Sequence, residues 1–209
     1  PLHIMTGNPS THDTWPAGIP RERPLVLERH REERQHELLQ TIADVVAVHR
    51  AIDAHRRAIV LVGHGWGGAV ISQVGEAAAV VALVYLAAYA PNCGESVEDL
   101  RRAEGAPAHV DFLHRDAAGL LAFAQDTWPS RVAQDVPIIN ARVLAAAQRP
   151  IQADSLDERL GGAVWHLRPC WFLVAERDRL VPPALQRRMA MGMGARMSSV
   201  RSGHALFLS

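Results

Sequence analysis

In residues 37–54, just before the apolar run Ile59–Val62, hydrophobic and polar positions alternate with the period of a helix. Positions spaced i, i+4, i+7, i+11 and i+14, four of them apolar and one a histidine, mark one face of residues 37–54, which predicts an amphipathic helix packed on a sheet. The residues on that face are Leu38, Ile42, Val45, His49 and Ile52. The run Ile59–Val62 follows, and its uninterrupted apolar composition predicts a strand covered on both faces, as in a parallel sheet.

Further apolar runs extend this pattern along the chain. Val80–Leu86 and Trp171–Ala175 predict two more buried strands. The short run Leu2–Met5 predicts a strand that leads into turn-forming residues, and Leu25–Leu27 is the only hint of a strand in the next charged stretch. Helical patterns separate the strands, which is typical of βαβ units. The sequence therefore predicts an α/β fold with a mostly parallel, doubly wound sheet.

The βαβ rhythm stops over residues 92–168. This interval contains no convincing strand and three helix-like stretches: Val97–Ala103, Ala117–Gln125 and Ile138–Gln148. We expect it to form a helical cap over one edge of the sheet. The prediction is one domain over residues 1–209, with a core made of residues 1–91 and 169–209.

Composition and charge exclude several classes of protein. The chain has 209 residues, 48% of them hydrophobic, and a formal net charge of zero, which argues against a disordered chain and gives no electrostatic footprint for nucleic acid or an anionic membrane. Arginines and glutamates balance over residues 21–37, which is typical of a solvated face. The longest apolar run, Ala77–Ala90, is too short for a bilayer span of roughly 20 residues. We therefore expect a small-molecule partner, with no nucleic acid and no membrane; the oligomeric state stays open.

Cysteine and histidine spacing indicates neither a metal site nor a cofactor. Cys93 and Cys170 are far apart, and neither belongs to a CxxC or Cys/His pattern, so we expect neither a disulfide framework nor zinc. Two cysteines without a visible secretory signal favour a reducing, cytoplasmic location. The chain begins at Pro1 and ends at Ser209, and we expect it to lack terminal elements of a complete fold.

Residues 60–70 read VLVGHGWGGAV, a strand, a sharp turn and the start of a helix. This is the form of a nucleophile elbow, in which a strained turn projects one side chain into the active site. Here the central position is Gly65, which can adopt such a backbone conformation without strain. The elbow therefore has no side chain at the nucleophile position.

On this elbow and the stretches after it, the sequence resembles the α/β-hydrolase fold family, in its small esterase-like branch. The resemblance covers about residues 38–209 and includes VVALVYLAAYAPNCGESVEDL, CWFLVAERDRLVPPALQRRMA and SGHALFLS. It implies the α/β-hydrolase fold and hydrolysis of a small ester or a related substrate. It also implies a catalytic acid after the strand that follows the cap, and a catalytic histidine near the carboxyl terminus.

The residues at those two positions are Asp178 and His204. In the family's mechanism, Asp178 would accept a hydrogen bond from one imidazole nitrogen of His204 and stabilise the imidazolium, while the other nitrogen serves as general base. The structural alternatives are that Asp178 caps a turn and that His204 is a surface histidine. The chain order of nucleophile position, acid and histidine is the order of this fold.

Two backbone N–H groups are the candidate oxyanion donors. The resemblance implies one from the loop Thr6–Gly7–Asn8, with Asn8 as the donor, because the following proline has no N–H. The other is the N–H of Trp66, directly after the nucleophile position. An ordinary turn is the alternative for the loop around Asn8.

The glycine at position 65 places the activity in question. No acyl or alkyl intermediate can form there. Ser72 is expected to pack away from the site, and His64 to point away from the substrate, so neither replaces the nucleophile. The ancestor had serine (GHSxGG) or aspartate (GHDWGG); we weight serine because the longer match favours it. The alternatives to an impaired esterase are a non-catalytic pseudoenzyme that binds a small molecule and a relic of a dehalogenase or epoxide hydrolase.

Overall fold

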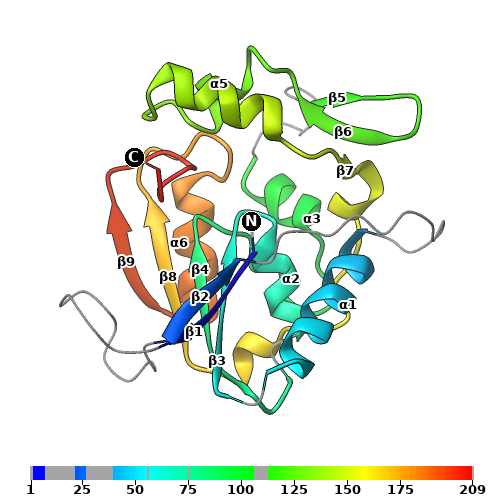
Figure 1. Ribbon diagram of the computed structural model, residues 1–209, viewed down its shortest axis with the longest axis vertical. Helices are drawn as coiled ribbons and strands as arrows, with labels where there is room; N and C mark the ends of the chain where they lie inside the picture. The colour runs from blue at the N-terminus through cyan, green and yellow to red at the C-terminus, as the bar shows by residue number, and fades with distance from the viewer. Residues whose placement is uncertain are drawn as a thin grey trace.

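Figure 1 shows a computed structural model of the chain, which describes residues 2–7, 22–26, 40–55, 57–74, 76–105 and 113–208. The main sheet has six strands in the order β2-β1-β3-β4-β8-β9. They are β1 (Leu2–Gly7), β2 (Glu22–Val26), β3 (Ile59–His64), β4 (Val80–Leu86), β8 (Cys170–Ala175) and β9 (Arg196–Val200). Strands β3, β4, β8 and β9 are parallel neighbours, whereas β1 is antiparallel to both β2 and β3. The predicted α/β class with a mostly parallel sheet is confirmed.

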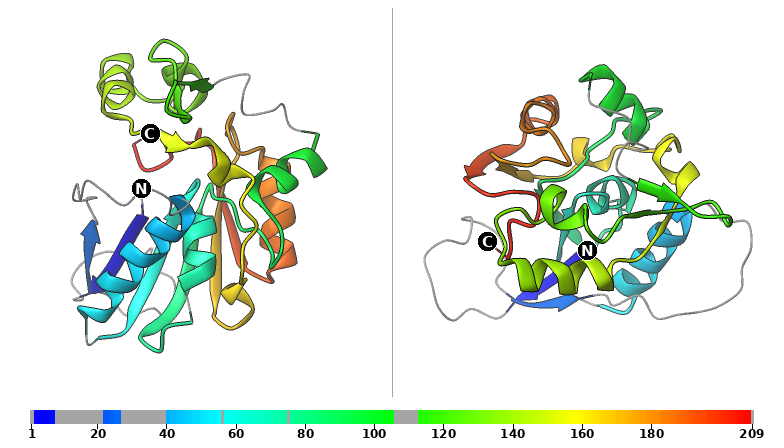
Figure 2. Two further views of the ribbon diagram at one scale, coloured as in Figure 1. Left: turned by 90° about the vertical axis from the view of Figure 1, so that its right-hand side faces the viewer. Right: turned by 90° about the horizontal axis from the view of Figure 1, so that it is seen from above.

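Three helices pack on one face of this sheet (Figure 2). They are α1 (Gln40–Asp53), α2 (Gly67–Val74) and α6 (Pro183–Gly192). Helix α1 lies within the predicted 37–54 segment, whose first residues are outside the described part of the chain. The predicted strands at 59–62, 80–86 and 171–175 are confirmed as β3, β4 and β8.

The core lies between these three helices and the face of the sheet that they cover. Tyr85 of β4 and Phe172 of β8 are both buried and stack with ring centroids 5.8 Å apart. Ser72 of α2 is fully buried, where its hydroxyl donates to the Gly68 carbonyl and lies 2.9 Å from the Tyr85 hydroxyl. Ser72 therefore belongs to the core, as the sequence indicated.

Residues 113–147 lie above the end of the sheet at which β8 and β9 point (Figure 1). They belong to the segment between β4 and β8 (residues 92–168, the insertion). Its helices are α3 (Val97–Ala103), α4 (Trp128–Arg131) and α5 (Ile138–Ala147), with short 3-10 turns η2 (Ala153–Leu156) and η3 (Val164–His166). It also contains a small antiparallel sheet of β5 (Leu113–Arg115), β6 (Leu120–Phe123) and β7 (Ile151–Gln152).

The expectation of an insertion without strands was therefore wrong, as was the helix-like reading of residues 117–125. The carboxylate of Asp116 accepts the N–H groups of Ala118 and Leu120, and Gly119 has a φ of +79°. This tight turn reverses the chain into β6, which then pairs with β5 and β7. Strand pairing and the turn outweigh the helical propensity of the alanines and leucines here.

Candidate active site

The turn between β3 and α2 has the geometry of an elbow. Gly65 has a φ of +54°, which lies in the left-handed region that favours glycine. Its carbonyl accepts the N–H groups of Tyr89 at 3.0 Å and Gly68 at 3.2 Å. A Cβ at Gly68 would collide with the Tyr89 carbonyl oxygen, so this glycine lets α2 pack closely on the chain after β4. Position 65 is therefore held at the carboxyl end of a central strand.

Asp178 lies just beyond β8 and is 6% exposed. Its Oδ1 accepts the N–H groups of Leu180 at 2.8 Å and Val181 at 2.9 Å. Its Oδ2 accepts from Nε2 of Gln186 at 2.9 Å and from Nδ1 of His204 at 2.8 Å. These donors compensate the burial of a carboxylate.

His204 is 4% exposed and follows β9. Because a carboxylate accepts, the Nδ1 atom that faces Asp178 carries a proton, and in the neutral ring Nε2 keeps its lone pair. A Cβ at Gly65 would lie 3.0 Å from this Nε2 and 3.3 Å from Cε1. The structure therefore brings Gly65, Asp178 and His204 together, with the free lone pair facing the place where a nucleophile's side chain would begin.

Trp66 is the next residue after the elbow glycine and precedes the start of α2. Its indole Nε1 donates to Oδ2 of Asp44 on α1 at 3.3 Å, which ties the elbow to that helix. Its backbone N–H occupies the chain position from which this fold donates to an oxyanion.

Asn8, the second expected oxyanion donor, lies outside the described residues. The strand before it, β1, runs antiparallel to β3, with Leu2 opposite Gly63 and Met5 opposite Val60. The Gly7 end of β1 therefore lies at the opposite end of β3 from Gly65. Asn8 and Trp66 as oxyanion donors both stay predictions.

His64, which was expected to point away from the substrate, contacts His204. The two imidazole rings have centroids 4.3 Å apart at an angle of 40°. The Nε2–H group of His64 donates to the His204 carbonyl at 2.8 Å. Sequence reasoning missed this contact because 140 positions separate the two residues, and no local pattern reports it.

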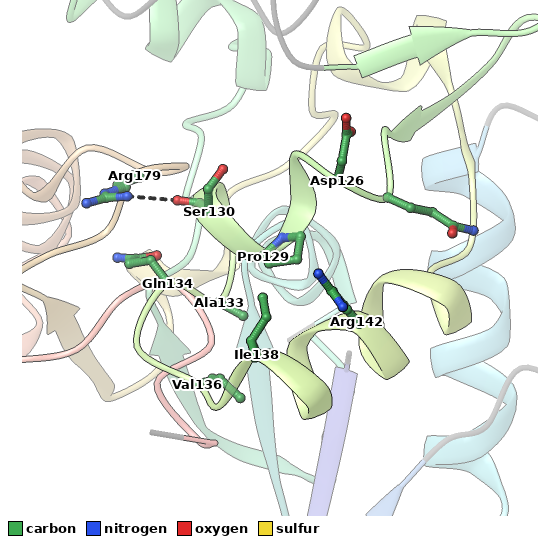
Figure 3. Close-up of a pocket in the computed structure, with 10 residues that line it drawn as sticks. Asp126, Pro129, Ser130, Ala133, Gln134, Val136, Ile138, Arg142 and Arg179 are labelled. Atoms are coloured by element: carbon green, nitrogen blue, oxygen red, sulfur yellow. Dashed lines mark hydrogen bonds between the residues drawn. The ribbon is translucent and has the colours of Figure 1, made fainter.

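A hollow of about 710 Å³ lies in the insertion beside the acid loop (Figure 3). Pro129, Ala133, Val136 and Ile138 contribute apolar lining. Arg179, which directly follows Asp178, lies at one side and donates to the Ser130 carbonyl at 3.0 Å. The volume is within the range of about 300–1,000 Å³ that is typical of small-molecule sites.

Among the described residues, no three histidine, cysteine, aspartate or glutamate side chains are grouped closely enough to hold a metal ion. A search of the same part of the chain finds no helix with the length and apolar character that a membrane crossing requires.

Comparison with known proteins agrees with this geometry. Residues 7–209 match the family described as the Alpha/beta hydrolase family. The chain belongs to this family. Comparison of this alpha/beta hydrolase with curated proteins gives no significant match.

Several solved structures share its fold. An extracellular alpha/beta-hydrolase from a Paenibacillus species is 20% identical, with a TM-score of 0.68 over 79% of this chain and 72% of that chain. Polyneuridine aldehyde esterase is 16% identical, with a TM-score of 0.67 over 82% and 75%. A pyrethroid hydrolase from Sphingobium faniae is 17% identical, with a TM-score of 0.65 over 82% and 73%. At these identities the likeness establishes the fold alone.

Proposed function

We propose that this alpha/beta hydrolase is esterase-like, with His204 as general base, Asp178 as its partner and Gly65 at a vacant nucleophile position. The observation that carries the proposal is the geometry of His204. Its Nδ1 is 2.8 Å from Asp178, while its Nε2 faces the Cβ position of residue 65 at 3.0 Å. The esterase and hydrolase structures that share the fold support the same class of reaction.

Without a nucleophilic side chain, hydrolysis runs through water. Nε2 of His204 takes a proton from a water molecule, whose oxygen attacks the ester carbonyl, and the N–H of Trp66 stabilises the oxyanion. The C–O bond to the leaving group then breaks, and the imidazolium returns its proton to the departing alkoxide. Only slow turnover is expected, because enzymes of this type lose most of their rate when the nucleophile is removed.

The test is restoration of the nucleophile. Gly65→Ser should hydrolyse short-chain aryl esters much faster than the parent chain, because a serine hydroxyl at this position faces Nε2. The matched control is Gly65→Ser combined with His204→Ala, which keeps the hydroxyl but removes the base. The proposal fails if the single variant is no faster than this double variant. Gly65→Asp, tested on haloalkanes and epoxides, examines the aspartate ancestor in the same way.

The hollow in the insertion, which Arg179 of the acid loop helps to line, favours one other function, non-catalytic binding of a small molecule. Its volume of about 710 Å³ and its apolar lining between arginines suit a small organic ligand. Binding to the folded state alone raises the melting temperature. A compound that raises it and is recovered unchanged supports the binder, whereas rapid conversion of every stabilising compound supports the enzyme.

A further inference from the structure

The backbone around His204 is anchored from two sides. On one side, the Nε2–H group of His64, the last residue of β3, donates to the His204 carbonyl at 2.8 Å. On the other side, the insertion accepts the two N–H groups that flank His204. Asp135 Oδ2 accepts from Gly203 at 2.5 Å, and the Val132 carbonyl accepts from Ala205 at 3.0 Å.

Side chains of the His204 loop also pack against the same two parts of the molecule, His64 on one side and the insertion on the other. The His64 ring lies against the His204 ring and meets Phe207 edge-on, with centroids 4.9 Å apart. On the insertion side, Ala205 packs in a small apolar cluster with Ala133 and Val136. The loop that carries His204 is therefore held between the elbow strand and the insertion.

The same stretch of the insertion also reaches the acid loop. Gln134 Nε2 donates to the Arg177 carbonyl at 2.7 Å, and the Ser130 carbonyl accepts from Arg179 at 3.0 Å. These two bonds lie on either side of Asp178. Residues 130–135 thus contact both loops whose side chains must meet for the Asp178–His204 hydrogen bond to form.

We infer that His64 and Asp135 are positioning residues for His204: each holds the backbone of the histidine loop so that Nε2 faces position 65. This inference rests on the proposed function, in which His204 is the base. Both residues hydrogen-bond to backbone groups of this loop, His64 to the His204 carbonyl and Asp135 to the Gly203 N–H. Their effect is to limit the motion of His204, because a base must stay in hydrogen-bond reach of the proton it takes.

The first experiment needs no activity. The ring nitrogens of the chain's histidines are observed by proton–nitrogen NMR, and His204→Gln assigns the His204 signals by their loss. The parent should show a protected Nδ1 proton at low field, because that proton is held by the buried Asp178. His64→Phe and Asp135→Ala should broaden this signal and speed its exchange with solvent.

Conservative variants separate the hydrogen bonds from simple packing. His64→Gln keeps an N–H donor and Asp135→Asn keeps an oxygen acceptor, so both should retain the protected signal. His114→Phe and Asp157→Ala make the same chemical changes as the disruptive variants at exposed positions of the insertion and should leave it unchanged. If His64→Phe does not fold, comparison of Asp135→Ala with Asp135→Asn still tests whether the hydrogen bond from the insertion holds the histidine loop.

The second readout uses the Gly65→Ser background. Loss of either anchor should lower kcat roughly five- to tenfold, as expected for one net hydrogen bond, with KM unchanged. An unprotected Nδ1 proton in the parent overturns the inference, and so does an unchanged signal in the folded His64→Phe and Asp135→Ala chains. Loss of the signal in His64→Gln overturns the role of the donor. If Gly65→Ser shows no turnover, the proposed function fails, yet the NMR comparison still tests the anchors.

Discussion

Gln186 and His204 donate to the same carboxylate oxygen of Asp178, at 2.9 Å and 2.8 Å. Gln186 is fully buried on α6, where its Nε2 also donates to the Val181 carbonyl and its Oε1 accepts the N–H of Ala175. One side chain thus joins the end of β8, the acid loop and the helix after it. The acid is positioned by its own loop and by this glutamine.

Replacing Gln186 by leucine should remove these bonds and leave the Ala175 N–H and part of the Asp178 carboxylate without partners. We expect a loss of about 3 kcal/mol in the free energy of unfolding, measured with urea. Gln152→Leu makes the same change at an exposed position of β7 and should stay within about 0.5 kcal/mol of the parent. Equal effects at the two positions would contradict the assigned network.

Asp99 in the first turn of α3 gives a prediction for acid stability. The Ser96 N–H donates to its carboxylate at 3.1 Å and the Arg159 guanidinium lies 3.2 Å away. The Ser96 backbone hydrogen bond is the main cause that holds the pKa of Asp99 below its usual value of 3.8, and Arg159 adds to it. The charged form is therefore favoured in the folded state.

Since the folded pKa is depressed, this stabilisation is fully present above about pH 4 and disappears as the pH falls through the folded pKa. Asp99→Asn should therefore destabilise the protein near pH 7, and the difference from the parent should shrink below pH 4. Urea unfolding across this range measures the difference. Asp53→Asn, at the exposed end of α1, is the control, and a gap for Asp99→Asn that widens in acid would reject the mechanism.

The two cysteines should differ sharply in reactivity. Cys93 is exposed, whereas Cys170 is 7% exposed at the start of β8, and burial raises the pKa of its thiol to about 12. Thiolates are the reactive form. A disulfide reagent at pH 8 should therefore modify Cys93 quickly and Cys170 only after unfolding. Cys93→Ser should abolish the fast phase, and fast labelling in that variant would show that Cys170 is not packed as described.

Much of the fold and of the site could be predicted because its signals are local. The apolar run of β3 and the glycines after it mark a strand, a turn and a helix within sixteen residues, 59–74. Asp178 and His204 were proposed from short motifs that resemble the family, and the structure places them 2.8 Å apart.

The features that sequence reasoning missed depend on distant pairing. Strand β6 is rich in leucine and alanine, and only its pairing with β5 and β7 makes it a strand. Every residue of strand β9 is exposed, and the strand carries no apolar run. The role of His64 arises from a contact across 140 positions. Tertiary context, rather than propensity, decides each of these cases.

The elbow itself offers the last prediction, Gly65→Ala. At a φ of +54° an alanine costs about 1–2 kcal/mol through its backbone alone. Gly194 has a similar φ of +62°, but a Cβ there would meet no heavy atom within 4 Å, so Gly194→Ala measures the backbone cost by itself. At position 65 the new Cβ also presses on Nε2 of His204, which Asp178 holds from the other side. Gly65→Ala should therefore lower the free energy of unfolding more than Gly194→Ala does. If the two losses are equal in urea unfolding, His204 does not face the nucleophile position.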